Sequence, residues 1–200
     1  MKLYISIFII AIFLGGCSTA EPPMIEYRVS VKPTIEKESS AQGCSKRSLK
    51  VAAAFSSSSL MSMDMNYALG DNKQYTYSQS QYATSPNYVI TSEVLKLLRE
   101  MKIFKTVQIS KSRSRNDYIL EISIDDFMQY FSEAEKSSYV NVVISFTLID
   151  TKDSTSIATR TFSSKVNSST LDAEGGVKAL GIAFEEVLNS SSKWFTEVCR

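Results

Sequence analysis

The segment from residue 140 to residue 148 alternates apolar and polar side chains with unusual regularity. A period of two places alternate side chains on opposite faces of a β-strand, so one face of this segment is expected to be buried. Residues 150–154 are typical of a turn, and residues 157–166 are expected to return antiparallel to the first strand. The chain must therefore build a sheet around this hairpin. The residues expected on the buried face are Val140, Val142, Ile144, Phe146 and Leu148.

Other strands and two helices are expected along the rest of the chain. A helix should begin at Ser85-Pro86, with Ser85 as its cap, because proline at the first helical position has no hydrogen bond to lose. The second helix should begin near Asp172. Since strands outnumber helices, we expect an α+β fold, a two-layer sandwich in which two helices pack on one face of a mostly antiparallel sheet. The remaining strands are expected at 27–31, 49–55, 65–69, 73–78, 104–109 and 118–127, with a hairpin turn at 70–72.

Each expected helix has one apolar stripe at helical spacing, which should face the sheet. Gly175, Gly176 and Gly181 each cost the second helix about 1 kcal/mol relative to alanine, so they indicate close packing on the sheet. The stripe of the first helix comprises Ile90, Val94, Leu97, Leu98 and Met101. That of the second comprises Val177, Leu180, Phe184, Leu188, Ser191, Phe195 and Val198, with Trp194 beside it.

Residues 1–16 are typical of a secretory signal peptide. Lys2 is followed by an apolar run at 3–13 that is too short to span a bilayer, and small residues precede Cys17. The string from Leu14 to Cys17 resembles the lipobox of bacterial lipoproteins. That resemblance implies cleavage before Cys17 and covalent attachment of a diacylglycerol and an N-acyl chain, such as palmitate, to this residue. The alternative is an ordinary signal peptide with an incidental cysteine.

Lipidation of Cys17 would anchor the chain to a membrane permanently, because several acyl chains together bind stably. Residues 17–24 are then expected to form a lipidated tether, stiffened by Pro22-Pro23, and residues 25–200 a single periplasmic domain. Ser18 stands where inner-membrane retention signals usually have aspartate. We therefore expect the protein to be anchored at the periplasmic face of the outer membrane. The alternative is the inner membrane.

The remaining chemistry of the sequence favours a binding protein. The chain has no histidine, which excludes Ser-His-Asp and Cys-His catalysis and argues against zinc, and we expect no enzyme activity, metal or cofactor. Without Lys2 the net charge is zero, which argues against a nucleic-acid partner. Adjacent acids, as at 125–126, should diverge and stay solvated. Cys44 and Cys199 are expected to form a disulfide in an oxidising compartment, and two unpaired thiols are the alternative.

Residues 61–88 combine methionine and tyrosine with serine, glutamine and asparagine. Tyrosine gives a large contact area at low entropic cost, so this composition favours a surface that binds a protein partner. The alternative is an edge hairpin whose tyrosines half-cover the sheet. The candidate partner-binding residues are Tyr67, Tyr75, Tyr77 and Tyr82.

Several strings resemble the ABC-type transport auxiliary lipoprotein family, which includes the lipoprotein subunit of paraquat-inducible-type MCE lipid transport systems. The resemblance implies a non-catalytic accessory that binds an MCE-type periplasmic protein and aids lipid transport between the inner and outer membranes. The alternative function is a general outer-membrane assembly lipoprotein that assists lipopolysaccharide or surface-fibre export. Besides the Cys17 lipobox, the matching strings are Met65-Asn66-Tyr67, Ser85-Pro86, Leu95-Lys96-Leu97-Leu98, Asp117 to Ile122, Gly176 to Leu180 and Lys193-Trp194-Phe195.

Overall fold

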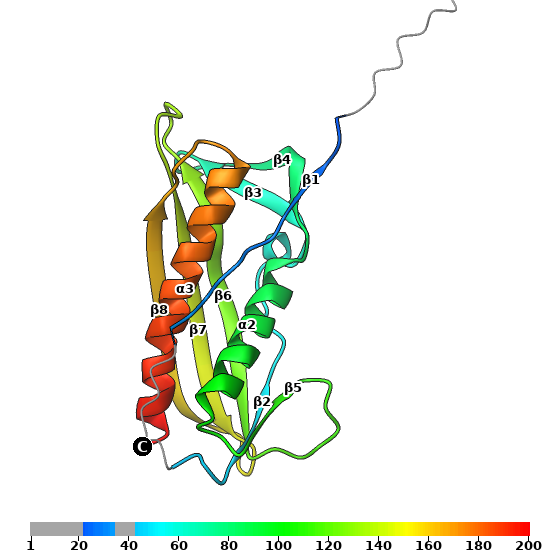
Figure 1. Cartoon of the computed structure of the whole chain (residues 1–200), viewed down its shortest axis with the longest axis vertical. Helices are drawn as coiled ribbons and strands as arrows, with labels where there is room; N and C mark the ends of the chain where they lie inside the picture. The colour runs from blue at the N-terminus through cyan, green and yellow to red at the C-terminus, as the bar shows by residue number, and fades with distance from the viewer. Residues whose placement is uncertain (1–21, 35–42) are drawn as a thin grey trace, which may run out of the picture.

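Three long strands form the centre of the sheet in the computed structural model, which describes residues 22–34 and 43–200. They are β6 (Tyr118–Phe131), β7 (Ser138–Asp150) and β8 (Thr155–Asn167), paired antiparallel in sequence order. The predicted alternation in β7 is confirmed, since all five residues expected on its buried face are buried. These strands run along the length of the molecule, with β8 at one margin (Figure 1).

Beyond β6 the sheet divides into two branches of shorter strands. At one end, β3 (Asp64–Leu69) pairs with β6, β4 (Lys73–Tyr82) with β3, and β1 (Ile25–Tyr27) with β4. At the other end, β2 (Ser48–Val51) lies between β6 and β5 (Thr106–Ile109). All of these short pairings are parallel except β3–β4, which is the predicted hairpin, with Gly70 at a φ of +61° in its turn. The expected α+β sandwich is confirmed, and the long antiparallel ladders dominate its sheet.

Two helices cover one face of this sheet. They are α2 (Pro86–Met101) and α3 (Ala173–Val198), and a short 3-10 turn, η1 (Ser58–Leu60), precedes β3. Figure 1 shows α3 lying along β7 and β8, and α2 beside it. The predicted stripes are confirmed, because their members are buried except Met101 and Val198, which are half-buried.

The two helices begin differently. Asp172 caps α3 through its carboxylate, which accepts a hydrogen bond from Gly175 N at 2.8 Å. Ser85 occupies the equivalent position before α2, but its side chain makes no capping bond. Its hydroxyl instead donates to Asn87 Oδ1 at 2.7 Å. Ser85 does occupy the cap position, but the expectation that its side chain caps the helix is wrong, because the hydroxyl is directed at the side chain of Asn87 and accepts no backbone N–H.

Aromatic rings link α3 to the sheet. Phe146 on β7 lies 5.5 Å from Phe195 and 6.0 Å from Phe162 on β8, measured between ring centroids. Trp194 completes this cluster at 6.0 Å from Phe162. Large rings bury much area and prefer such edge contacts, so this cluster fixes the C-terminal half of α3 over β7 and β8.

Residues 28–34 are not a strand, contrary to the expected strand at 27–31. Their alternating burial is as predicted, but their backbone bonds to helix side chains. Lys32 N donates to Glu185 Oε2 at 3.0 Å, and Thr34 N donates to Asn189 Oδ1 at 2.8 Å. The segment crosses in front of the helices (Figure 1), and we call residues 28–34 the strap. A Cβ on Gly181 would lie 2.8 Å from Ser30 O, so this glycine packs under the strap and not on the sheet.

The expected strand at 49–55 ends early, at Val51. Leu49 and Val51 are buried as predicted, but Phe55 is 56% exposed and makes only an isolated bridge to Ser123. Ala54 is buried in its place, and its N–H donates to Thr91 on α2. Contact with α2 thus ends the alternation.

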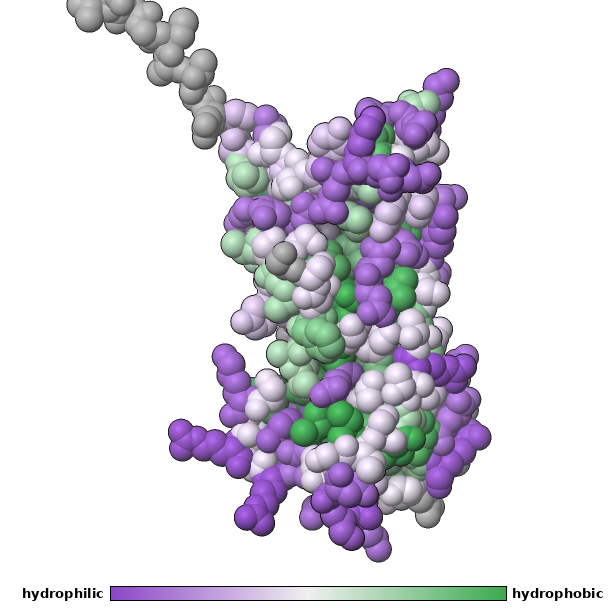
Figure 2. Space-filling model, turned by 180° about the vertical axis from the view of Figure 1, so that it is seen from behind, coloured by the Kyte–Doolittle hydropathy of each residue, from purple (hydrophilic) through white to green (hydrophobic). Residues whose placement is uncertain are grey.

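The face of the sheet opposite the helices carries no helix within the described part of the chain. Figure 2 shows this side, where apolar side chains gather in the middle and lower part and hydrophilic ones cover much of the top and the margins. None of the described helices is both long enough and apolar enough to serve as a membrane span.

Candidate functional site

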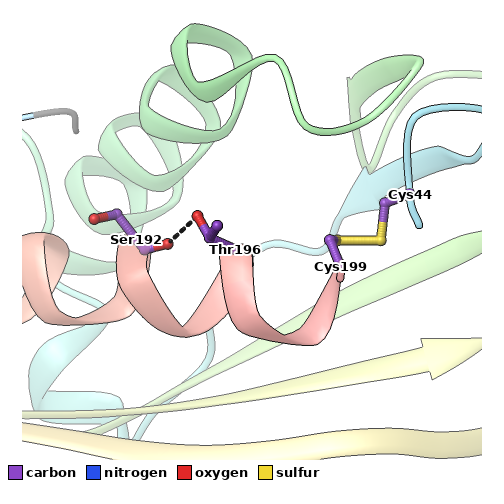
Figure 3. The surroundings of a disulfide bond; sticks show 4 residues. All are labelled: Cys44, Ser192, Thr196 and Cys199. Carbon is purple, nitrogen blue, oxygen red and sulfur yellow. Dashed lines mark hydrogen bonds between the residues drawn. A yellow bond between two sulfur atoms is a disulfide. The ribbon is translucent and has the colours of Figure 1, made fainter. Parts of the chain in front are cut away.

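The predicted lipidation residue and the predicted disulfide have different outcomes. Cys17 and the whole signal peptide lie outside the described residues. Cys44 and Cys199 are bonded to each other, with their Cα atoms 5.1 Å apart across 155 residues of sequence. Figure 3 shows Cys199 at the end of α3 and Cys44 in the segment that leads to β2. The predicted pairing is confirmed.

Backbone contacts reinforce the disulfide. Gly43 N donates to Cys199 O at 2.8 Å, and Arg47 N donates to Cys44 O at 2.9 Å. A Cβ on Gly43 would stand 2.8 Å from Cys199 O, so only glycine allows this approach without displacement. The C-terminal end of α3 is thus held covalently and by hydrogen bonding to the start of β2.

Three of the four candidate tyrosines gather on the helix-side face of the β3–β4 hairpin. The ring of Tyr67 lies 4.6 Å from that of Tyr77 and 5.6 Å from that of Tyr75. Phe131 on β6 closes the group at 5.3 Å from Tyr67. Tyr75 is 45% exposed, whereas Tyr67 and Tyr77 are half-buried. The hairpin therefore presents one exposed tyrosine supported by a packed aromatic cluster.

A hydrogen-bond chain joins this cluster to β6 and the start of β7, beneath α3. Tyr77 Oη donates to Gln129 Oε1 at 3.0 Å, and Gln129 Nε2 donates to Ser138 Oγ at 3.0 Å. Gln129 is buried against Gly176, where any Cβ would clash with its amide. Burial raises the pKa of Tyr77 far above its usual range, and nearby Tyr67 raises it further. Tyr77 is accordingly a neutral structural hydroxyl at physiological pH.

Tyr82 does not belong to this surface. Its side chain is 3% exposed and lies in the core, with its ring 6.4 Å from Phe127. Burial raises its pKa strongly. The assignment of Tyr82 as a partner-binding residue is therefore corrected. It follows the bulge that interrupts the β3–β4 register, and it turns towards the core there.

A groove lies at the same end of the molecule, on the open face of the sheet. It has a volume of about 690 Å³. Its walls come from the β3–β4 turn and from the β6–β7 turn, and its floor includes Tyr130 and Tyr139. These two rings stack across the strands with centroids 5.2 Å apart. The groove and the tyrosine cluster therefore occupy opposite faces of one end of the sheet.

Asp125 and Asp126 do not diverge as expected, because a register irregularity of β6 lies at this point. Asp125 accepts from Ser145 Oγ at 2.6 Å, and Asp126 accepts from Asn141 Nδ2 at 2.8 Å. Ser145 and Asn141 share the open face, so both carboxylates lie there. Each has its own donors, and Tyr130 Oη also donates to Asp126 at 2.7 Å. Burial raises the pKa of Asp126, although these donors oppose it.

Sequence reasoning missed a second groove, between β8 and α3. Arg160 Nη1 lies 3.5 Å from Glu197 Oε2 across it, and its volume is about 430 Å³. Trp194 and Phe162 form its apolar floor, and Ser190 lies on its helix side. No local pattern in the sequence signals this groove, because its two walls are separated by about 30 residues and meet only in the folded molecule. Among residues 22–34 and 43–200, no cluster of acidic or cysteine side chains is arranged to hold a metal ion.

No protein-family model matches this sequence, and no curated protein is similar to it. Solved structures are similar in fold. Protein XCC0632 from Xanthomonas campestris, described under the family model DUF330, superimposes with a TM-score of 0.76 at 18% identity, covering 87% of this chain and 96% of that one. A crystal structure of an uncharacterized protein gives 0.64 at 11% identity, covering 87% and 99%. At these identities the likeness concerns the fold alone, and the chain has the fold seen in XCC0632.

Proposed function

We propose that this chain is a lipid-anchored, non-catalytic accessory protein of an ABC/MCE-type lipid transport system in the bacterial envelope. The observation that carries the proposal is the Leu14-Gly15-Gly16-Cys17 string, since lipid attached there would hold the domain at a membrane. The sequence resemblance to auxiliary transport lipoproteins is the ground on which we propose the transport system and the MCE-type partner. Ser18 favours the outer membrane.

Two of the matching strings lie where elements of the fold contact one another. Asp117 begins the string that leads into β6, and its Oδ2 accepts from both the N–H and the hydroxyl of Ser48, each at 2.7 Å. These bonds lower the pKa of Asp117. They also fix β2 beside β6. The Lys193-Trp194-Phe195 string contributes to the aromatic cluster between α3 and the sheet.

In this proposal the protein acts by binding, and the β3–β4 hairpin contacts the MCE-type partner. Tyr75 is the most exposed tyrosine of the hairpin, and the half-buried Tyr67, itself packed on Tyr77, stacks against it. A rigid tyrosine with few rotatable bonds contributes contact area at low entropic cost. The tether leaves the sheet from β1, which pairs with β4 of the same hairpin. The described end of the tether, residues 22–24, therefore leads into the same branch of the sheet as the contact surface.

Two measurements test the proposal. The intact mass of membrane-extracted protein should begin at Cys17 and include acyl chains, and Cys17→Ser should release the protein from membranes. Tyr75→Glu should reduce co-purification with the MCE-type protein by about tenfold, because it places an unpaired charge in a contact surface. A Cys17→Ser protein that is still membrane-bound would contradict the anchor.

Tyr88 offers a matched control for the contact surface. It is also an exposed tyrosine, at 61%, but it lies in the first turn of α2. Tyr88→Glu should leave co-purification and the melting temperature unchanged. Equal loss of binding in both variants would remove the hairpin from the proposal, and normal binding by Tyr75→Glu would do the same.

A further inference from the structure

The outer edge of β8 is an open ladder of backbone groups. Ser168 N donates to Ser138 O at 3.0 Å, which fixes the alternation of the β7–β8 ladder. Residues 160, 162, 164 and 166 therefore bond to β7, while the N–H and C=O groups of the residues between them point away from the sheet. No described residue bonds to those outward groups. The regular stretch runs from 158 to 167 without a proline. The outward residues are Thr159, Thr161, Ser163, Lys165 and Asn167.

The two charged side chains of β8 do not protect this edge. Exposed edges are usually blocked by charges, prolines, bulges or a covering element. Lys165 Nζ lies 3.6 Å from the ring centroid of Tyr139, over the open face of the sheet. Arg160 turns to the other face, where it pairs with Glu197 and lies 5.4 Å from the ring centroid of Phe162. Both cations are held on faces of the sheet, and the backbone between them is accessible.

The β8–α3 groove runs beside the same edge. Thr161 and Ser163 line it from the strand, and Ser190 and Trp194 line it from the helix. A strand edge next to a helix is a geometry in which extended peptides bind, since the edge supplies hydrogen bonds and the groove receives alternate side chains. The volume of about 430 Å³ accommodates side chains from such a peptide.

We propose that β8 binds an extended segment of a protein partner as an added strand of the sheet. The segment presents apolar side chains to the groove, against Phe162 and Trp194. Its alternate side chains are polar and face the row of Thr159, Thr161 and Ser163 on the open side. The inference goes beyond the proposed accessory function and does not depend on lipid attachment or on the hairpin.

A second copy of the chain fits this edge less well. Two copies paired antiparallel about Phe162 would set Ser164 of one opposite Arg160 of the other. Ser164 Oγ donates to Glu186 at 2.6 Å, and Arg160 pairs with Glu197. At each end of this strand pairing, the carboxylates of Glu186 and Glu197 would therefore lie beside the single guanidinium of Arg160. A partner segment without an acidic residue at that place avoids the repulsion.

The described N-terminal residues lie away from this edge. β1, from which the tether leaves, belongs to the branch of the sheet on the far side of β6, while β8 lies beyond β7. Figure 1 shows β1 at the upper right of the molecule and β8 at its left margin. A partner can therefore add a strand to β8 while another surface of the protein faces the membrane.

The test uses the full chain in detergent micelles and a short fluorescein-labelled peptide that alternates valine with threonine. Binding is measured by fluorescence anisotropy, with a proline-substituted peptide as the probe control. Thr161→Pro with Ser163→Pro removes two outward donors and leaves the ladder to β7 intact, because edge strands tolerate proline where the N–H faces solvent. We expect this variant to weaken binding by about tenfold or more, since two backbone hydrogen bonds are lost.

Thr161→Val with Ser163→Ala is the matched control, because it changes the same side chains and keeps both N–H groups. It should bind the peptide as wild type does. In wild-type protein the amides of Thr161 and Ser163 should exchange more slowly once the peptide is added, a measurement independent of the proline variant. Equal binding of both peptides, or undiminished binding by the proline variant, would overturn the proposal. So would a wild-type dimer that the proline variant abolishes, because the edge would then serve a second copy.

Discussion

Asp126 shows how a single irregularity can change the environment of a charged residue. The register irregularity of β6 turns Asp126 onto the open face with Asp125, and Tyr130 and Asn141 then donate to it. Burial favours the neutral acid, whereas both donors favour the carboxylate. The balance raises the pKa of Asp126, so burial has the larger effect.

A raised pKa makes Asp126 a source of pH dependence. The folded state binds its proton more tightly than the unfolded state, so this residue stabilises the fold below the unfolded pKa of about 4 and loses that contribution as the pH rises through the folded value. Urea unfolding at several pH values should show wild type gaining stability relative to Asp126→Asn as the pH falls. Asp125→Asn, a loss of charge on the same strand, is the control. The same trend in both variants would show that Asp126 is not its source.

The tyrosines mark how far residue types alone could identify the candidate site. Their density drew attention to the β3–β4 hairpin, where three of the four tyrosines form one cluster, because tyrosine and methionine are common where proteins expose contact area. Composition could not show which of the four tyrosines are exposed. The side chain of Tyr82 is buried and that of Tyr75 is exposed, and the bulge that separates them follows from pairing with β3, which composition does not encode.

The start of α3 depends on one carboxylate. Asp172 accepts from Gly175 N at 2.8 Å, and this bond lowers its pKa. Asp172→Ala should reduce the free energy of unfolding by about 1 kcal/mol, the usual cost of losing a capping side chain. Chemical denaturation measures this loss. Asp172→Asn keeps an acceptor and should stay within a few tenths of a kcal/mol of wild type. Equal losses in both variants would show that the charge matters and the cap does not.

Elements with strong periodicity were predictable and those fixed by distant contacts were not. β7 and both helices have regular stripes, so the buried residues followed from spacing alone. The strap also has alternating burial, yet its backbone bonds to Glu185 and Asn189 on α3. Alternation reveals which side chains are buried, but it does not reveal which partner receives the backbone hydrogen bonds.

The order of strands across the whole sheet also could not be predicted from the sequence. The antiparallel pairings β3–β4 and β7–β8 were predicted from their short turns, which leave few alternatives, whereas the pairing of β6 with β7 was not. The parallel pairings of β3 and β2 with opposite ends of β6 join segments about 60 to 70 residues apart in sequence. Such pairings depend on where the helices cross between strands, which local patterns do not specify.

The Cys44–Cys199 disulfide closes most of the described chain into one covalent loop. Its separation of 155 residues gives it a chain-entropy stabilisation of up to about 5 kcal/mol. Cys44→Ser with Cys199→Ser should lower the melting temperature and speed amide exchange first in residues 194–200, where the helix end is held. Free-thiol labelling of denatured, unreduced protein should find no reactive thiol in wild type once Cys17 is acylated. An unchanged melting temperature would mean that the aromatic cluster and the backbone bond from residue 43 to residue 199 are enough to hold the helix.

The strap and the disulfide together determine how the molecule would respond to mechanical force. A pull on the N-terminus first loads β1 and then the two backbone bonds between the strap and α3. Once these bonds break, the chain can extend only up to Cys44. There the disulfide transmits the force to Cys199 at the end of α3. Residues 22–43 would extend by about 75 Å at most. Residues 22–43 would therefore lengthen under tension up to a limit set by the disulfide, while the strands other than β1 stay folded.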